Sequence, residues 1–366
     1  MNILAIGPTK GVVTGQSNAF STFVAKSKHK ILVVNTNAEG MRSFRRSFVS
    51  IAAIWKTFRI FLSSSCIDCL YITTSRSKAG SIKDIACIGL ASIFGVPVVN
   101  HLHGANFTKF RDELGFFQRG IIDWVYSKVH VSIVLHDKLR TQYSCFKQMR
   151  IEVVENFVSS EIAVLNRSGR DVVAGEIRVL YLSNILPEKG IYELMSAFSN
   201  ISKIQPMSFS LKIAGKILPD SSYWINEFEK RLQSGSAAGG LIEYCGVADM
   251  EQKLKLLHWA DILCLPSYHP GEAVPLAVLE GLGSGCYLIV SDHALLPSLI
   301  EGFVGCVVPA RNVKALENAL LNVSDNRDLL HQAQVHNVEL SRVKFAENTY
   351  ISGIDMILQG CAEIEY

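Results

Sequence analysis

Two acidic residues interrupt an apolar stretch of the chain, SYHPGEAVPLAVLEGLGSG over 267–285. Glu272 lies in a loop, Pro275 suits the first turn of a helix, and Glu280 lies two turns deeper. Eight helical residues rise about 12 Å, which matches an elongated ligand and not a pair of acids sharing one proton. Carboxylates accept hydrogen bonds from vicinal hydroxyls, and a helix start offers amides to a diphosphate. The pair predicts a nucleotide sugar held at both ends, although either acid alone is typical of an exposed surface.

A glycine-rich segment, GPTKGVVTGQSNAF, follows the first apolar run. Gly7, Gly11 and Gly15 precede a helix start expected near Ser17, where backbone amides can approach an anion. The spacing is not G-x-G-x-x-G, and no acid closes the next run, ILVVN. The segment therefore indicates either a phosphate site or an ordinary turn, and it excludes a dinucleotide fingerprint.

Histidine and lysine side chains follow two other apolar runs. In HLHG, His101 and His103 are two residues apart, so in a strand both side chains lie on the same face, near the carboxyl end of the strand. Each histidine is either a functional residue or a structural one. LSNILPEKG places Lys189 just before Gly190 and a predicted helix. That lysine can neutralise a phosphate, or it is an ordinary solvated charge.

The elements that carry these groups form two series of strands. Near-continuous β-branched runs indicate strands covered on both faces, hence parallel sheets. The first series occupies 2–7, 31–35, 69–74, 96–104, 131–135 and 151–156. The second occupies 177–183, 209–215, 241–246, 261–267, 286–292 and 305–310. Ligands of such sheets bind at the carboxyl ends of the strands, so the crevice between two domains is the expected site.

The charge distribution differs between the two halves of the chain. Residues 1–160 contain 20 Lys and Arg and 9 Asp and Glu, a balance of +11, and 161–366 contain 16 and 24, a balance of −8. A basic half favours an anionic partner. Nucleic acid is disfavoured because the sequence shows neither a recognition motif nor an aromatic stacking platform.

Composition excludes several other classes of protein. No apolar run reaches the roughly 20 residues of a membrane-spanning helix, and the start MNILAIGPTKG indicates a first strand and not a signal peptide. We therefore expect a cytoplasmic protein. The nine cysteines lack framework spacing, and the single C-x-x-C, Cys66 and Cys69, has no second pair to complete a zinc site.

The motifs in this order resemble those of the retaining glycosyltransferases with the Glu, seven residues, Glu motif (glycosyltransferase family 4, group 1 type). The resemblance covers nearly the whole chain and is strongest over 177–310, in YLSNILPEKGIYELMSAF, YCGVADMEQKLKLLHWADILCLPS and GEAVPLAVLEGLGSGCYLIVSD. It implies the GT-B fold, an α/β architecture of two doubly wound Rossmann-like domains facing each other across a cleft.

The expected domains follow from the strand series and the resemblance together. An acceptor-binding domain would cover 1–160, a linker 161–176, and a nucleotide-sugar-binding domain 177–345. A C-terminal helix over 346–366 would pack back on the first domain.

The resemblance also implies roles for individual residues. Glu272 would contact donor-sugar hydroxyls, Glu280 the ribose and Lys189 the diphosphate, with Lys189, Glu272 and His103 as the catalytic set. Gly15 would lie near the phosphates or the acceptor, and His103 near the reacting sugar. Further donor contacts would come from Asn184, Ala273, Val274, Pro275 and Leu276. Asn184 departs from the family, since many members have Arg there.

The implied reaction transfers a sugar from a nucleotide-diphosphate donor to a hydroxyl with retention of configuration. The sequence contains no Asp-x-Asp, so we expect catalysis without a metal and no cofactor besides the donor. Charge on the leaving group would then fall on Lys189 and helix-end amides. Two alternatives stay open, a nucleotide-sugar epimerase of the same architecture and a non-catalytic subunit that binds sugar nucleotides.

A basic amphipathic helix is predicted over 41–62. Its apolar stripe consists of Phe44, Phe48, Ile51, Trp55 and Phe58. Its basic side consists of Arg42, Arg45, Arg46 and Lys56. Such a helix lies on an anionic membrane, or it packs its stripe on the sheet and exposes a solvated basic face. We favour packing for the apolar residues, and both interpretations hold if only the basic face meets lipid.

With the basic first half, this helix favours a lipid-linked saccharide acceptor in bacterial surface polysaccharide synthesis. The enzyme would then associate peripherally with the inner face of the cell membrane.

Overall fold

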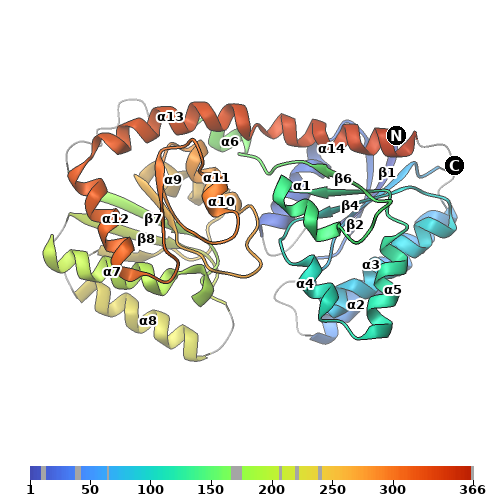
Figure 1. Cartoon of the computed structure of the whole chain (residues 1–366), viewed down its shortest axis with the longest axis horizontal. Helices are drawn as coiled ribbons and strands as arrows, with labels where there is room; N and C mark the ends of the chain where they lie inside the picture. The colour runs from blue at the N-terminus through green and yellow to red at the C-terminus, as the bar shows by residue number, and fades with distance from the viewer. Residues whose placement is uncertain are drawn as a thin grey trace. The chain divides into compact units, whose positions relative to one another are not determined.

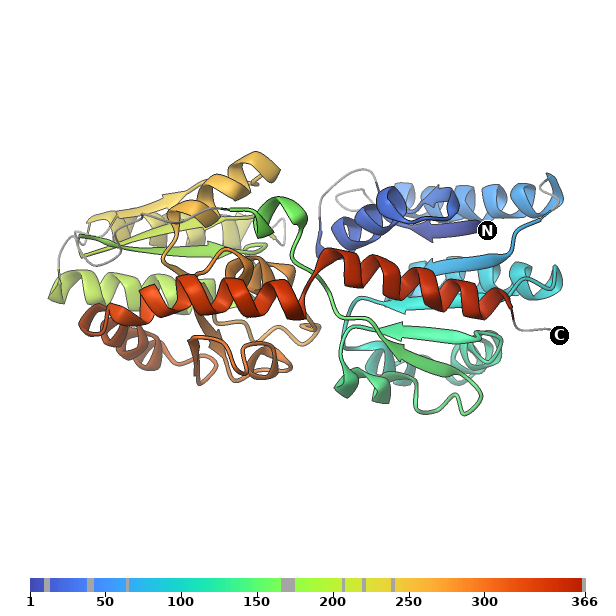
Figure 2. The ribbon, with the colours of Figure 1, turned by 90° about the horizontal axis from the view of Figure 1, so that it is seen from above.

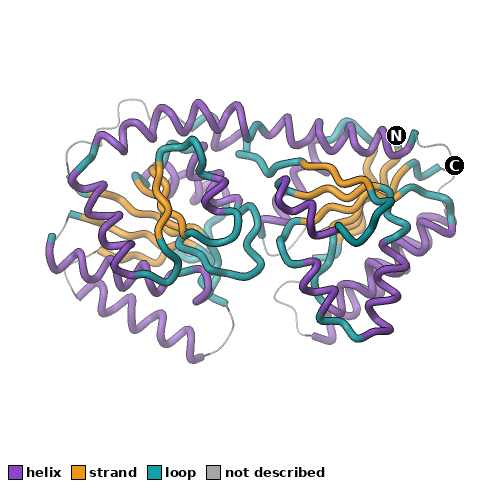
Figure 3. The backbone as a smooth tube through the Cα atoms, viewed as in Figure 1, coloured by secondary structure: helices purple, strands orange, loops and turns teal. Residues whose placement is uncertain are grey.

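The computed structural model describes residues 1–9, 14–37, 43–63, 66–165, 175–205, 208–218, 222–237 and 241–363, with the backbone alone at 43–47, 222 and 234–237. The chain divides into two compact units, Met1–Asn156 with Asn348–Tyr366, and Phe157–Glu347. Each unit contains a six-stranded parallel sheet flanked by helices (Figure 3). The expected fold class, α/β with two doubly wound sheets, is confirmed.

The first sheet has the strand order β2-β1-β3-β4-β5-β6. Its strands are β1 (Asn2–Gly7), β2 (Lys30–Asn35), β3 (Cys69–Thr73), β4 (Val98–Leu102), β5 (Val131–Val134) and β6 (Arg150–Val153). Every described residue of β3, β4 and β5 is buried, as expected for strands covered on both faces. The order reverses beside β1, so the loops after β1 and β3 diverge at this point.

Helices cover both faces of the first sheet. They are α1 (Gly15–Lys26), α2 (Ser43–Ser63), α3 (Lys78–Ile93), α4 (Phe107–Asp112), α5 (Phe116–Tyr126), the 3-10 helix η1 (Asp137–Tyr143) and α14 (Glu347–Ala362). On one face, α3 packs between α2 and α5 (Figure 1). The other face is covered by α14 (Figure 2), whose Tyr350 hydroxyl donates to the Ala19 carbonyl of α1 at 3.3 Å.

The second sheet has the order β12-β11-β10-β7-β8-β9. Its strands are β7 (Ile177–Leu182), β8 (Phe209–Ala214), β9 (Leu241–Tyr244), β10 (Ile262–Leu265), β11 (Tyr287–Ser291) and β12 (Gly305–Val308). All registers are parallel, and β7 is paired directly with β10. This pairing places the ends of two strands that are far apart in the sequence next to each other.

The helices of the second unit separate these strands in the sequence. They are α6 (Ser160–Ala163), the 3-10 helix η2 (Pro187–Lys189), α7 (Ile191–Ile204), α8 (Ser222–Ala237), α9 (Met250–Trp259), α10 (Leu276–Gly283), α11 (Leu296–Leu299), α12 (Val313–Asp325) and α13 (Asp328–Lys344). Asp249 caps α9 in a reciprocal capping box with Gln252. The expected linker, 161–176, begins within α6 and lies mostly outside the described residues.

The orientation of α2 differs from our expectation. Its apolar stripe does not pack on the sheet, because Phe48, Ile51 and Trp55 are 61%, 62% and 60% exposed. The helix instead buries the adjacent row at i, i+4 spacing, which includes Thr57 and Phe61. Four side chains of the predicted apolar stripe and basic side lie outside the described part of the chain. They are Arg42, Phe44, Arg45 and Arg46.

Among the described residues, no helix combines the length and apolar character needed to cross a membrane.

Candidate functional site

Lys189 and Glu272 form an ion pair in the second unit. The Lys189 Nζ lies 3.0 Å from Oε1 and 2.7 Å from Oε2 of Glu272, and the Ser267 hydroxyl donates to Oε2 at 2.6 Å. Glu272 is 5% exposed. A buried carboxylate needs such partners, because burying an unpaired charge is costly. The pair therefore holds one positive and one negative group ready at the carboxyl ends of β7 and β10.

Backbone contacts bring these two residues together across 83 positions. The Tyr268 amide donates to the Glu188 carbonyl at 2.7 Å, which joins the loop after β10 to η2. Gly190 has φ +76°, and a Cβ there would lie 2.2 Å from the Pro266 carbonyl oxygen. Only glycine allows this close approach in the left-handed region. Gly190 is therefore a structural requirement for the Lys189 position.

We expect Gly190→Ala to lower the free energy of unfolding by about 3 kcal/mol or more, since it combines left-handed strain with a backbone clash. Gly246→Ala is the matched control, because Gly246 has φ +72° but no atom within 4 Å of an added Cβ. Urea denaturation compares the two variants. Equal losses would show that the close approach to Pro266 contributes nothing.

Glu280 forms a second buried ion pair. It lies in α10, is 4% exposed, and accepts from the Lys253 Nζ of α9 at 2.7 Å. A surface position for this acid, the alternative that the sequence left open, is thus wrong. Lys253 and Ser267 were not identified from the sequence. The available signal for Lys253 was its position one turn into the helix before the acidic motif. The signal for Ser267 was its hydroxyl at the end of a predicted strand.

The segment between the two acids presents backbone to its surroundings. Ala273, Val274 and Leu276 are buried, and Pro275 is the N-cap of α10 with no side-chain capping bond. The first amides of α10 therefore have no capping side chain, and a helix N-terminus favours an anion. Asn184 lies in the loop after β7, where its carbonyl accepts from the Tyr181 hydroxyl at 3.1 Å.

The two histidines of HLHG occupy different environments in the first unit. His101 lies inside β4, is fully buried, and pairs through Nδ1 with the Tyr71 hydroxyl at 2.7 Å. It is therefore a core residue and not a group at the sheet edge. His103 lies past the strand end with its ring stacked on His101, 4.0 Å between centroids. Within the described chain, neither ring nitrogen of His103 has a hydrogen-bond partner.

Arg76 is the cationic group beside His103. It lies in the loop after β3, donates through Nη1 to the Asn106 Oδ1 at 3.0 Å, and occupies the space that a Cβ on Gly104 would need. In the described part of the chain, no carboxylate lies within ion-pair distance of Arg76. Burial lowers the pKa of its guanidinium. Arg76 was not predicted as a site residue, although a basic residue after a strand was also the signal for Lys189.

Burial and the neighbouring Arg76 charge lower the pKa of His103 to about 3 from its ordinary 6.5. Between these two values the unfolded chain binds a proton that the folded chain does not. Stability from this residue is therefore complete above pH 6.5 and declines as the pH falls.

Between pH 6 and pH 4, we expect His103→Gln to remove about 1.4 kcal/mol per pH unit from the slope of unfolding free energy against pH. His331→Gln on α13 is the control, since His331 is exposed. Denaturant titrations at a series of pH values measure the slopes. An unchanged slope for His103→Gln would mean that this ring is protonated in the folded protein.

Gly15 begins α1, and Thr14 caps that helix. Thr14 accepts from the Ser17 amide at 3.2 Å, and its own amide donates to the Ser17 hydroxyl at 2.7 Å. This capping box fixes the helix start that follows β1. Gly11 lies outside the described residues. Gly15, Arg76 and His103 thus follow β1, β3 and β4, whereas Lys189, Glu272 and Glu280 belong to the second unit.

The donor atoms of the second unit suit a ligand with hydroxyls and phosphates. Two buried carboxylates can accept from hydroxyl pairs, and a lysine with an uncapped helix start can receive negative charge. In the first unit, taken by itself, His103 is a neutral imidazole beside the Arg76 guanidinium. Among the described residues, no group of three or more His, Cys, Asp or Glu side chains is arranged to hold a metal ion.

Comparisons with known proteins agree with this chemistry. Residues 166–337 match the sequence profile of the family described as glycosyl transferases group 1. Glycogen synthase of Mycobacterium tuberculosis is 26% identical over 252 residues, covering 65% of this chain and 57% of that protein. The amylovoran biosynthesis glycosyltransferase AmsK of Erwinia amylovora is 28% identical over 163 residues, covering 42% and 38%. The chain thus spans little more than half the length of the first relative and less of the second.

Solved structures share the fold over nearly the whole chain. Anabaena Alr3699/HepE in complex with UDP superposes with a TM-score of 0.74 at 14% identity, covering 98% of this chain and 100% of that one. The sucrose-phosphate synthase of Thermosynechococcus elongatus gives a TM-score of 0.74 at 13% identity, covering 98% and 99%. These likenesses confirm that the fold is of the GT-B type.

Proposed function

We propose that the protein is a glycosyltransferase that moves a sugar from a nucleotide-diphosphate sugar to a hydroxyl acceptor. The observation that carries the proposal is the arrangement around α10, where two buried carboxylates, each paired with a lysine, flank a helix start without a capping side chain. The glycosyl transferases group 1 match over 166–337 covers all four of these charged residues. Solved structures of this fold in complex with UDP and UDP-glucose support the same donor class.

Each charged group has a role in donor binding. Glu280 accepts from the ribose hydroxyls while Lys253 holds its carboxylate in place. Glu272 accepts from hydroxyls of the transferred sugar, and Lys189 turns from Glu272 toward the diphosphate. The amides of Ala273, Val274 and Leu276, the turn at Pro275 and Asn184 would bind the phosphate end. Gly15 would contact the phosphates or the acceptor.

The groups of the site also supply the chemistry of transfer. As the bond to the sugar breaks, negative charge grows on the diphosphate, where Lys189 and the α10 amides stabilise it. Because the sequence has no Asp-x-Asp, we propose that this stabilisation needs no metal and no further cofactor. A neutral His103 can donate one hydrogen bond to the reacting sugar and accept another. The acceptor hydroxyl then gives its proton to the leaving phosphate oxygen and bonds to the sugar carbon on that same face, which retains the configuration.

We propose a lipid-linked saccharide as the acceptor, bound to the first unit at the inner face of the cell membrane. The support is the +11 charge of residues 1–160 and the similarity to AmsK, whose name places it in amylovoran biosynthesis. A basic surface attracts the phosphates that join a saccharide to a lipid carrier and the anionic lipids around it. The function would then be polysaccharide synthesis by a cytoplasmic, peripheral membrane enzyme.

A thermal-shift screen of nucleotide sugars tests the donor assignment. A ligand at 100 times its dissociation constant stabilises a protein by about 2.7 kcal/mol, so one nucleotide sugar should raise the melting temperature clearly above the rest. Product analysis with that donor should then show release of the nucleoside diphosphate. A protein that no nucleotide or nucleotide sugar stabilises would contradict the proposal.

A further inference from the structure

Exposed aromatic side chains are concentrated on one layer of the first unit. Among the described residues, every exposed Phe or Trp belongs to α2, α5 or the C-cap of α3. These residues are Phe48, Trp55, Phe94, Phe116, Phe117 and Trp124. Phe116 and Phe117 are 79% and 83% exposed. Single exposed apolar residues are common on any protein, but six large aromatics on one layer indicate an interaction surface.

The three helices of this layer lie side by side. Figure 1 shows α3 between α2 and α5 on the face of the first sheet opposite α14. On α5, Phe117, Ile121 and Trp124 follow i, i+4, i+7 spacing and form one exposed stripe. The exposed residues of α2, Phe48 and Trp55, are seven positions apart on the same side of their helix. We call the outer face of these helices the α2-α3-α5 face.

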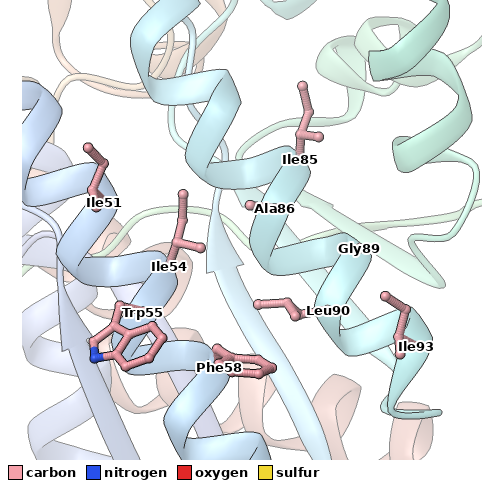
Figure 4. Close-up of a pocket in the computed structure, with 9 residues that line it drawn as sticks. All are labelled: Ile51, Ile54, Trp55, Phe58, Ile85, Ala86, Gly89, Leu90 and Ile93. Atoms are coloured by element: carbon pink, nitrogen blue, oxygen red, sulfur yellow. The ribbon is translucent and has the colours of Figure 1, made fainter.

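A groove runs between α2 and α3 within this face. Its volume is about 530 Å³, and its lining residues are all uncharged. Figure 4 shows Ile54 and Phe58 of α2 turned toward α3, on the side where Leu90 lies. The groove is thus an apolar recess in an apolar surface, wide enough to receive flexible hydrocarbon.

Positive charge accompanies the aromatic residues. The three helices contain seven Lys and Arg and two Asp. Both acids are already paired, Asp84 with Lys83 at 2.8 Å in the core and Asp123 with Arg111 at 2.6 Å. Lys83 is buried with Asp84, and the side chains of Arg45 and Arg46 lie outside the described part, so the described cations of the α2-α3-α5 face are Lys56, Arg59, Lys78 and Arg119. The helices themselves add no unpaired acid.

Elements next to the layer carry further charges. Arg111 contacts Asp112, the last residue of α4, at 3.1 Å as well as Asp123, and Glu113 has Lys109 at 3.9 Å. After α5, the Lys128 Nζ lies 5.9 Å from the centre of the Trp124 ring. Aromatic residues flanked by Lys and Arg suit the border between lipid headgroups and hydrocarbon, where rings meet acyl chains and cations meet phosphates.

We propose that the α2-α3-α5 face docks on the surface of a bilayer that contains anionic lipids. Its aromatic side chains would lie at the boundary between the lipid headgroups and the acyl chains; they are Trp55, Phe116, Phe117 and Trp124. Self-association through this face is disfavoured, because it would bring two surfaces of the same positive charge together. This docking deepens the proposed function. It rests on that function only for its purpose, which is to bring the enzyme to a lipid-linked acceptor in the membrane. Docking itself needs no donor and no transfer.

Flotation of the full chain with vesicles tests the docking. We expect binding to phosphatidylcholine vesicles containing phosphatidylglycerol, much weaker binding to phosphatidylcholine alone, and a steep loss with salt, since the Debye length is about 10 Å at 0.1 M. Phe116→Ser, Phe117→Ser and Trp124→Ser together should weaken partitioning about 100-fold or more. Arg59→Gln, Arg119→Gln and Lys128→Gln together should weaken it about 100-fold and reduce the preference for phosphatidylglycerol.

A matched control removes exposed apolar side chains from other surfaces. Met356 of α14 and Val343 of α13 are 64% and 78% exposed, so Met356→Ser with Val343→Ser should bind vesicles as the parent does. Because the substituted positions are exposed, apart from the half-buried Arg119, the melting temperatures should stay close to the parent value. UDP binding, measured without lipid, should be unchanged in every variant, which separates failure of the docking from failure of the proposed function.

Tryptophan emission gives a readout that a structural role would not move. Trp55 and Trp124 should shift to shorter wavelength on vesicles, whereas Trp55→Phe with Trp124→Phe should bind equally well and lose the shift. The proposal is overturned if the parent ignores phosphatidylglycerol vesicles at low salt, if the serine variant binds as tightly as the parent, or if emission stays unchanged. A parent dimer that the serine variant dissociates would instead assign the face to a second copy.

Discussion

Replacing Lys189 by alanine should lower kcat by about 100- to 1,000-fold, with a smaller change in donor affinity. The reason is that its charge meets the diphosphate most strongly as the bond to the sugar breaks. Steady-state kinetics with the donor found by thermal shift measures both quantities. Lys255→Ala is the matched control, because Lys255 is an exposed lysine of the same unit, bound to Glu251 at 2.6 Å.

The alanine variant also leaves Glu272 with Ser267 as its remaining hydrogen-bond donor. An uncompensated buried carboxylate costs about 3–5 kcal/mol of stability, which would lower activity for a trivial reason. Lys189→Met with Glu272→Gln removes both charges and should regain much of the stability without regaining activity. Turnover near the parent rate in folded Lys189→Ala would remove this lysine from the mechanism.

Glu280→Gln should weaken UDP binding by about 5- to 150-fold, which corresponds to about 1–3 kcal/mol. The carboxylate would accept two hydrogen bonds from the ribose, and an amide of the same shape accepts fewer. Lys253→Met should have a smaller effect, because Lys253 acts through the position of Glu280. Titration calorimetry with UDP alone isolates the ribose end from the sugar end.

Glu317 provides the control for this substitution. It is another buried acid of the second unit, 6% exposed, and it accepts from Lys314 at 2.8 Å and Asn200 at 2.6 Å. Glu317→Gln should cost stability but leave UDP affinity unchanged. If both variants lose affinity equally, the effect reflects the folded fraction and not a contact with ribose.

The strands were predictable because their residues obey one local rule. Runs such as ILVV and LIV are apolar on both faces, which only a covered parallel sheet tolerates, and each of the twelve predicted runs overlaps a strand. The helix start expected near Ser17 lies two residues earlier, at Gly15, because Thr14 caps the helix. Local sequence thus determined the elements and their order.

The partners of the site residues depend on the arrangement of strands, which local patterns do not state. Lys189 meets Glu272 because β7 lies next to β10, and the reversal of strand order that places them there arises from tertiary packing. Lys253 meets Glu280 because α9 leads into β10 and α10 follows the same strand. The prediction for His101 was wrong because period-2 alternation gives the face of the sheet on which a side chain lies. It does not say whether that position is at the end of the strand or in the core.

Which face of α2 is exposed could also not be predicted from local sequence patterns. An apolar stripe at helical spacing normally packs on a core, and only the tertiary structure shows that Thr57 and Phe61 take that role while Trp55 stays outside. Whether an apolar row is core or interface is decided by what the remainder of the fold leaves uncovered.

The anomeric configuration of the product tests the central claim most directly. The protein is incubated with its best nucleotide-sugar donor and a saccharide acceptor, with and without a chelator, and the reaction is followed by proton NMR. We predict a new glycosidic bond of the same configuration as the donor, with one nucleoside diphosphate released per bond and no effect of the chelator. An inverted product, or an epimerised nucleotide sugar with no transfer to any acceptor, would contradict the account.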